Sequence, residues 1–131
     1  MSAETLATVT LVVPDYDAGT EFYVGKLGFE LIEDVALGDG KRWVVVGLAG
    51  GARLLLAKAA NDAQAAAIGN QTGGRVSFFL ETDNFAETHA RFMAAGVEFL
   101  EEPRHEVYGI VAVFSDPFGN RWDLLERKET R

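Results

Sequence analysis

Asp123 has the surroundings that point most directly to chemistry in this chain of 131 residues. It stands between Trp122 and Leu124 in an apolar stretch near the C-terminus. A carboxylate is costly to bury there unless it is hydrogen-bonded or takes part in chemistry. One interpretation makes Asp123 a general base, or an acceptor for a donor on a ligand. The other makes it a structural carboxylate satisfied by a neighbouring hydroxyl, by Arg121 or by water, and the sequence favours neither.

A polar segment at residues 101–109 supplies the other candidate side chains. The guanidinium of Arg104 is suited to bidentate binding of a carboxylate or phosphate, and the ring of Tyr108 to stacking on a flat ligand. The alternative is a solvated charge cluster that binds nothing. His105 belongs to the same segment, whereas His89 falls within a predicted helix, where a packed or surface histidine is expected.

The composition excludes several other kinds of site and partner. The chain has no cysteine, which removes disulfides, thiol catalysis and cysteine-bound zinc. It has no glycine-rich phosphate loop. A formal net charge of −8 repels a phosphate backbone, so we expect no nucleic acid partner. The apolar run Leu6–Val13 is too short to span a bilayer, and no basic region of a secretory signal precedes it, so we expect a cytoplasmic protein without membrane contact.

A series of strand and helix signals must position these residues. Residues 8–13 alternate as a strand does, with Val9 beginning the apolar side and with Thr8 and Thr10 on the other. A helix follows, for which Pro14–Asp17 offers N-caps. Phe22, Tyr23 and Leu27 are spaced for one face of it, and the sequence predicts that Gly28 ends it as a left-handed C-cap. Strands are then predicted at residues 29–32, 42–48 and 53–58, separated by glycine-rich turns.

The second half of the chain repeats this order. A strand at 76–82 leads to a helix that Asn84 and Glu87 begin as a capping box and that Gly96 ends. Strands follow at 97–100, 110–115 and 121–126. Four pairs of residues lie 68 positions apart: Asp15 and Asp83, Gly28 and Gly96, Glu30 and Glu98, Leu56 and Leu124. The sequence therefore predicts an α+β fold of two βαβββ modules, at about 5–58 and 76–128, joined by a linker at 59–75 in a single domain.

The pattern of alternation decides which side chains lie opposite the helices. Each module places its helix against one face of its strands, so the apolar side should pack against the helix. This assigns Leu54, Leu56, Trp122 and Leu124 to the core. The opposite face then carries Thr8, Thr10, Leu55, Ala57, Ser77, Phe79, Glu81, Arg121, Asp123 and Leu125. Both faces of the strands at 42–48 and 110–115 are apolar, and their orientation stays open.

Local motifs add a family resemblance over essentially the whole chain. Val12–Asp15, then Phe22-Tyr23 and Leu27–Phe29, are similar to the first strand, the helix and the helix end of the vicinal oxygen chelate superfamily. Asp116–Leu124 resembles the final hairpin of that superfamily, which includes glyoxalases, bleomycin resistance proteins and extradiol dioxygenases. The resemblance implies mixed sheets curved into a cup.

The resemblance also identifies the positions that hold a divalent metal in the superfamily's enzymes. They lie on the first, fourth, fifth and eighth strands, and here they fall on Thr8, Leu55, Ser77 and Asp123. Only Asp123 suits a metal, because threonine and serine are weak ligands and leucine is none. We therefore expect no metal and no other cofactor, with a divalent metal as the alternative.

The function that the resemblance implies is metal-free binding of a small molecule by sequestration, in a homodimer of the bleomycin-resistance type. The net charge suits a cationic, aromatic ligand. The residues expected to bind it are Thr8, Thr10, Leu55, Ser77, Phe79, Arg104, Tyr108 and Asp123. One alternative is a lyase, isomerase or dioxygenase that uses a metal or Asp123 as the catalytic base. Another is a partner-binding module with an unused cup.

Overall fold

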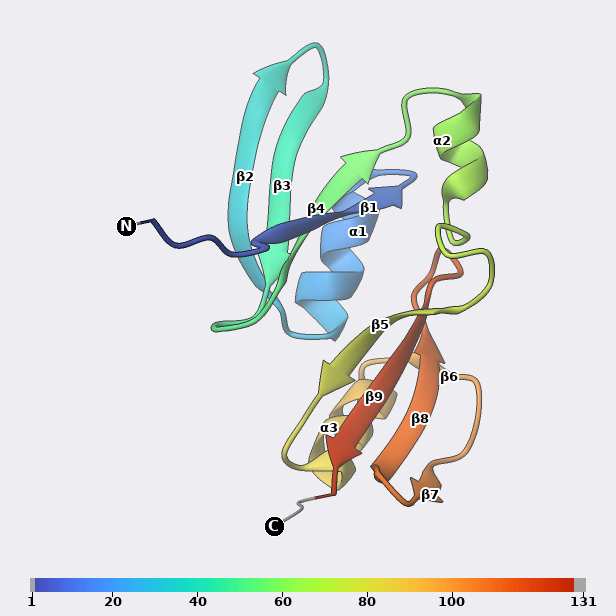
Figure 1. The fold of residues 1–131 in the computed structure, drawn as a ribbon. Helices are drawn as coiled ribbons and strands as arrows, with labels where there is room; N and C mark the ends of the chain where they lie inside the picture. The colour runs from blue at the N-terminus through green and yellow to red at the C-terminus, as the bar shows by residue number, and fades with distance from the viewer. Residues whose placement is uncertain (1, 129–131) are drawn as a thin grey trace. The chain divides into compact units, whose positions relative to one another are not determined.

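The computed structural model describes residues 2–128 of the chain. The chain divides into two compact units between Ile68 and Gly69. Each unit contains one mixed β-sheet with a helix on one of its faces (Figure 1). The predicted α+β class and the two related modules are thus confirmed. No helix in residues 2–128 is long and apolar enough to cross a membrane.

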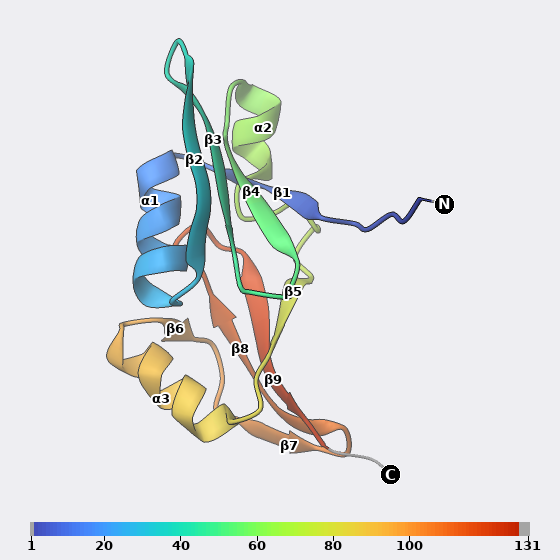
Figure 2. The same ribbon diagram turned by 90° about the vertical axis from the view of Figure 1, so that its left-hand side faces the viewer.

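The first unit contains a four-stranded sheet in the order β1-β4-β3-β2. Its elements are β1 (Thr8–Val13), α1 (Tyr16–Thr20), the π-helix η1 (Glu21–Lys26), β2 (Glu30–Gly38), β3 (Lys41–Gly47), β4 (Arg53–Lys58) and α2 (Asp62–Ala67). Strands β1 and β4 are parallel, and the other neighbours are antiparallel. Figure 2 shows α1 along one face of this sheet.

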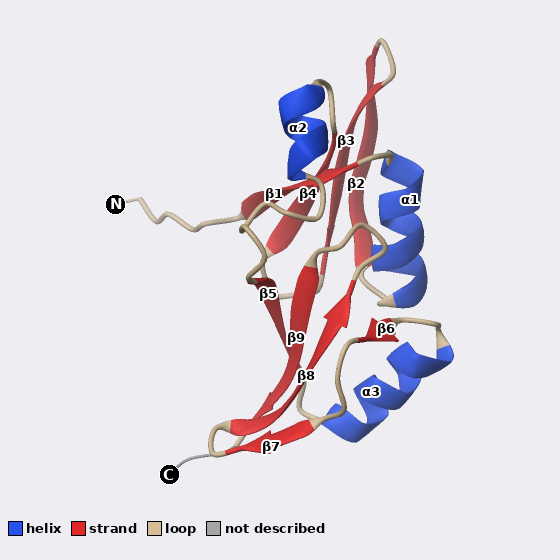
Figure 3. Ribbon diagram, turned by 90° about the vertical axis from the view of Figure 1, so that its right-hand side faces the viewer, coloured by secondary structure: helices blue, strands red, loops and turns tan. Residues whose placement is uncertain are grey.

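The second unit contains a five-stranded sheet in the order β5-β9-β8-β6, with β7 also paired to β8. Its elements are β5 (Val76–Glu81), α3 (Phe85–Ala94), β6 (Glu98–Phe99), β7 (Arg104–Glu106), β8 (Gly109–Ser115) and β9 (Arg121–Arg127). Strands β5 and β9 are parallel, like β1 and β4. Figure 3 shows α3 along one face of this sheet.

The β7 strand is a correction to the predicted loop at this position. Residues 104–106 pair antiparallel with residues 109–111 across a tight turn. The polar sequence Arg-His-Glu gives no strand signal of its own, so the hydrogen bonds to β8 are what hold it extended. This pairing attaches the Arg104 segment to the sheet.

Both helices begin and end at the predicted caps. The side chain of Asp15 accepts a hydrogen bond from the N–H of Ala18 at 2.9 Å, and that of Asn84 accepts one from Glu87 at 3.2 Å. Gly28 and Gly96 have φ values of 80° and 86°, the left-handed conformation that glycine adopts without strain.

The predicted capping box at the second helix is only half formed. The N–H of Asn84 donates to the hydroxyl of Thr82 at 3.1 Å and not to Glu87. The Thr82 hydroxyl, just before the cap, takes the place of the glutamate.

The two helices differ by one residue, and the π-helix η1 lies where the extra residue is. Gly28 follows its N-cap Asp15 by thirteen positions, whereas Gly96 follows Asn84 by twelve. A π-turn holds one more residue than an α-turn, so the helix can start and finish against the same strands in both units. Equivalent residues of the two units are therefore 68 positions apart after the helices and 69 positions apart before them.

The core of each unit lies between its helix and its sheet. In the first unit the predicted helix face is confirmed, because Phe22, Tyr23 and Leu27 are all almost fully buried. The assignment of Val9 to the core was wrong. Its side chain is 43% exposed, because only the later part of β1, from Leu11, is covered.

The second unit has an aromatic core. Phe114 is fully buried and contacts three rings, those of Phe92 and Phe99 at 5.5 and 5.6 Å and that of Trp122 at 5.8 Å. Phe78 extends this cluster by lying 4.6 Å from Trp122. One face of the second sheet is therefore sealed against α3.

Replacing Phe114 by alanine should lower the free energy of unfolding by about 3–5 kcal/mol, because it leaves a cavity among packed rings. Phe79 is the matched control, since it lies on the same sheet but is 62% exposed. Phe79→Ala should change the stability by less than about 0.5 kcal/mol. Urea unfolding of both variants measures the difference, and equal losses would contradict the assignment of the two faces.

Candidate functional site

The open face of the second sheet, opposite α3, is fixed by contacts on the covered face. Phe114 and Trp122 pack towards α3, and the carboxylate of Glu126 accepts a hydrogen bond from the N–H of Phe85, the first residue of α3, at 2.7 Å. Because side chains alternate along a strand, Asp123 lies on the open face.

Asp123 lies in a row of three side chains across this open face. It is paired with Phe79 on β5 and with Val113 on β8. Its Oδ1 atom is buried and has no hydrogen-bond partner among residues 2–128. Buried carboxylate oxygens normally have a donor, so Oδ1 is an acceptor that the described residues leave unsatisfied.

Arg104 lies near Asp123, but its donors are directed to other groups. Its Nε donates to Glu101 at 2.9 Å and its Nη1 to Glu106 at 2.5 Å, and it also has a side-chain hydrogen bond with Tyr108. The second oxygen of Glu101 accepts from the N–H of Val113 at 2.9 Å. The guanidinium of Arg104 is therefore held in place by carboxylates. Two of its donors are already engaged, which leaves fewer donors for an anionic ligand than the sequence alone indicates.

The pKa of Asp123 is raised above the ordinary aspartate value. Burial of the carboxyl group is the main cause; the charge of Arg104 acts against it, and the charge of Glu101 adds to it. The direction agrees with the unpaired Oδ1 atom, because a carboxylate without donors is poorly stabilised in its ionised form.

The predicted site residues divide between the two units. Phe79, Arg104, Tyr108 and Asp123 belong to the open face of the second sheet or its border. A bulge between Val76 and Phe78 takes Ser77 out of the regular register, and its hydroxyl is 3.1 Å from that of Thr72. Leu125, predicted on this face, is almost fully buried.

The first sheet carries a corresponding row made of Thr10, Leu55 and Val45. Thr8 lies two residues before Thr10 on the same side of β1. The orientation of the strand at 42–48, which the sequence left undecided, follows from Arg42. This side chain contacts α1, so the neighbouring Trp43 lies on the opposite face of the sheet. The indole N–H of Trp43 donates to Glu33 at 3.2 Å.

Glu101 is the candidate residue that sequence reasoning missed as part of a site. The signal for Glu101 was its spacing of three residues before Arg104, the only nearby cation in a segment of acidic residues. Trp43 was one of several rings that the sequence offered to an aromatic ligand, but its strand has two apolar faces, so alternation did not show which face it is on.

The residues at the superfamily's four metal positions do not fit a metal. Leu55 has no donor atom, and the hydroxyl of Ser77 is engaged with Thr72. Within residues 2–128 no group of three or more His, Cys, Asp or Glu side chains could hold a metal ion. These four positions therefore provide no ligand set for a metal-dependent reaction.

The two histidines lie in different surroundings. The ring of His89 stacks on Phe85 at 5.4 Å and lies 4.4 Å from Phe99. His105 is exposed on β7, where it pairs with Ile110.

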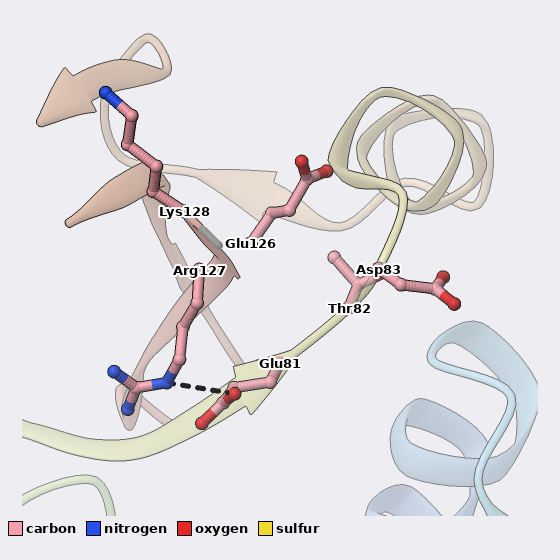
Figure 4. A pocket seen from close by; sticks show the side chains of 6 residues that line it. All are labelled: Glu81, Thr82, Asp83, Glu126, Arg127 and Lys128. Atoms are coloured by element: carbon pink, nitrogen blue, oxygen red, sulfur yellow. Dashed lines mark ion pairs between the residues drawn. The ribbon is translucent and has the colours of Figure 1, made fainter. Parts of the chain in front are cut away.

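A hollow of this unit lies at the ends of β5 and β9 (Figure 4). Its side chains are polar or charged, and Glu81 is ion-paired to Arg127 at 3.0 Å. Glu126 caps α3, and Asp83 and Lys128 point in different directions in the figure. This hollow lacks both an apolar wall and a convergent set of donors, so it is a weaker candidate than the open face around Asp123.

Comparisons with known proteins agree on one family. The family model of the Glyoxalase/Bleomycin resistance protein/Dioxygenase superfamily matches residues 5–124. An uncharacterized protein of Shewanella frigidimarina (strain NCIMB 400) is 48% identical over 94% of this chain and 93% of its own length.

Two solved structures are similar over nearly their whole length. The crystal structure of UcmS2 is 31% identical, with a TM-score of 0.81, and the match covers 95% of this chain and 98% of that one. The crystal structure of TnmS3, described as an antibiotic binding protein from Streptomyces sp. CB03234, is 27% identical, with a TM-score of 0.77 and coverage of 98% and 99%.

Replacing Asp123 by asparagine should raise the free energy of unfolding at neutral pH. The raised pKa means that ionisation is less favourable in the folded than in the unfolded chain. This penalty is absent below the ordinary pKa of 3.8, where the group is protonated in both states, and it grows as the pH rises through the folded-state value. Urea unfolding should therefore show a gain at pH 7 that shrinks towards acid pH.

The control is Asp116, a buried carboxylate with a full set of donors. It accepts from the N–H groups of Phe118 and Asn120 at 2.9 and 2.8 Å, and from the Asn120 amide at 2.7 Å. Asp116→Asn should therefore be destabilising at neutral pH. A comparable loss in Asp123→Asn would show that Asp123 has partners after all.

Proposed function

The chain belongs to the glyoxalase/bleomycin resistance protein/dioxygenase superfamily, and we propose that it binds a cationic aromatic small molecule by simple complex formation. The observation that carries this proposal is the buried, unpaired Oδ1 atom of Asp123 on the open face of the second sheet. A protonated amine on a ligand would give this oxygen the donor that the protein does not supply.

The charges around Asp123 support a cation over an anion. On this face and at its border, Glu81, Glu101, Glu106 and Asp123 are four carboxylates against the three guanidinium groups of Arg104, Arg121 and Arg127. Glu101 and Glu106 hold Arg104 and Glu81 holds Arg127, so the local charge has a small negative excess. The net charge of −8 on the whole chain adds to the attraction for a cation.

Two exposed rings support an aromatic ligand. Phe79 is 62% exposed in the same row as Asp123, and Tyr108 is 47% exposed at the border of the sheet. Such rings offer surfaces on which a flat ligand can stack. Binding by shape, stacking and charge needs no metal and no turnover.

Sequestration of an antibiotic is the form of binding that the similar structures support. TnmS3 is described as an antibiotic binding protein, and its fold covers nearly all of this chain. A protein that holds a toxic molecule lowers its free concentration without altering it, which is a route to resistance. A homodimer and a cytoplasmic location belong to the same proposal.

The test is binding of 2-naphthylmethylammonium, a cationic naphthalene derivative. The cation should raise the thermal unfolding midpoint of chelator-treated protein in proportion to the logarithm of its concentration. Asp123→Asn should weaken its binding about tenfold or more, because a charge-assisted hydrogen bond is lost. Affinity for the cation should fall with acid at a pH above that of an ordinary aspartate, since the pKa of Asp123 is raised.

Two controls decide whether the effect belongs to this face. Asp62→Asn removes a carboxylate from α2 in the first unit and should leave binding of the cation unchanged. Bleomycin, a cationic glycopeptide, is the probe for a larger ligand. Equal affinity of the Asp123→Asn variant for the cation would overturn the proposal, and so would a midpoint that rises with Ni²⁺, Mn²⁺, Fe²⁺ or Zn²⁺ and returns with chelator.

A general base is the second candidate function, and the raised pKa of Asp123 is the observation that favours it. Such a base would remove a proton from the carbon beside a carbonyl group and return it in the same site. Proton NMR in D₂O should then show deuterium exchange into an aromatic hydroxyketone that is lost in Asp123→Asn. Exchange at the same rate in both proteins would contradict this role.

A further inference from the structure

The first sheet is split at one end, between β3 and β4. These strands pair only from Val44 to Gly47 and from Arg53 to Leu56. Beyond this region the start of β3 pairs only with β2, and the end of β4 pairs only with β1. The β2–β3 hairpin extends past the end of β4 in Figure 1 and Figure 2. The two strands therefore diverge and leave an opening in the sheet.

This opening, the β3–β4 notch, has a volume of about 390 Å³, within the range of small-molecule sites. Its walls come from both strands and from the β2–β3 turn. They include Leu37 and Trp43, which are 60% and 40% exposed, and also Leu55. The hydrogen bond from Trp43 to Glu33 fixes one edge of the indole ring. The notch thus offers a fixed aromatic surface and apolar walls.

The hydroxyl of Tyr16 lies in the notch as an unused donor. It accepts a hydrogen bond from the N–H of Arg42 at 3.2 Å, in the place that a β4 carbonyl would take in a fully paired sheet. The Tyr16 side chain is about nine-tenths buried. Its own O–H proton has no acceptor among residues 2–128, and buried hydroxyls normally donate as well as accept.

The charge of the notch is opposite to that of the whole chain. Its lining carries Lys41, Arg42 and Lys58 against Asp39 alone. The guanidinium of Arg42 is ion-paired with Asp17 at 2.9 Å and with Asp34 at 2.8 Å, on the face of the sheet that α1 covers. Neither lysine ammonium has an ion-pair partner within the described part of the chain.

We propose that the β3–β4 notch is a second binding site, for a flat aromatic anion. The rings of the ligand stack on Trp43 between Leu37 and Leu55, and its anionic group accepts from the Tyr16 hydroxyl. Lys41 and Lys58 neutralise the charge at the mouth of the notch. This site lies in the first unit and does not depend on the cation site proposed around Asp123.

The probe is 2-naphthalenesulfonate, titrated against the chain of 131 residues with tryptophan fluorescence as the readout. Trp122 is nearly fully buried, so quenching should come from Trp43 and disappear in Trp43→Phe. Tyr16→Phe keeps the ring and removes the hydroxyl, and should weaken binding about tenfold. Lys41→Gln combined with Lys58→Gln should weaken it by about tenfold or more, with an effect that salt reduces.

The matched control is Lys26→Gln combined with Arg53→Gln, which removes two positive charges of the same unit outside the notch. Its affinity for the sulfonate should stay within about twofold of the original protein. Asp123→Asn should also leave sulfonate binding unchanged, which separates this proposal from the cation site. Unfolding midpoints of all variants, measured without the probe, show that each is folded.

Three results would overturn the proposal. The sulfonate could fail to bind at millimolar concentration, or bind equally to Tyr16→Phe and to the double lysine variant. The naphthylmethylammonium cation could quench Trp43 as strongly as the sulfonate does. Any of these would show that the notch does not select an anion.

Discussion

A single helix covers one face of each sheet, and this packing decides where the remaining side chains point. On β9, Trp122 packs into an aromatic cluster beneath α3, so Asp123 must lie on the open face. A slip of one residue would put the carboxylate into that cluster. Removing a buried aromatic side chain from the core costs about 3–5 kcal/mol, whereas leaving a buried polar atom unpaired costs about 1–3 kcal/mol, and more when the group is charged. Packing of the aromatic core therefore determines the register of β9, and the unpaired oxygen of Asp123 is a consequence of that register.

The same constraint explains why Arg104 does not neutralise Asp123. Arg104 is on β7, whose place beside β8 is fixed by backbone pairing. From there its guanidinium meets Glu101 and Glu106 first, and Glu101 is itself tied to the N–H of Val113. Glu101 and Glu106 hold the guanidinium of Arg104 at a fixed distance from the carboxylate of Asp123. The Oδ1 atom of Asp123 therefore stays without a donor although a cation lies nearby.

Much of the fold followed from the sequence, because local signals and long-range packing agree. Caps at Asp15 and Asn84 and the glycines that end the helices are local, and alternation placed Asp123 correctly. The sequence did not predict β7, whose polar residues are held extended only by their pairing with β8, or the burial of Leu125 on the open side. It also could not orient β3, since Trp43 and Val44 are both apolar and only the contact of Arg42 with α1 distinguishes them.

The duplication gives two rows of equal geometry and different chemistry. Leu55 and Asp123 are 68 positions apart, and each is the middle of a row that runs across three paired strands. In the first unit the middle residue of the row is a leucine. The polar groups lie in the β3–β4 notch and are the Tyr16 hydroxyl and two lysines. In the second unit the carboxylate itself is at the centre. Because packing against the helices fixes both backbones, the two faces can differ in the charge they attract while the strand arrangement stays the same.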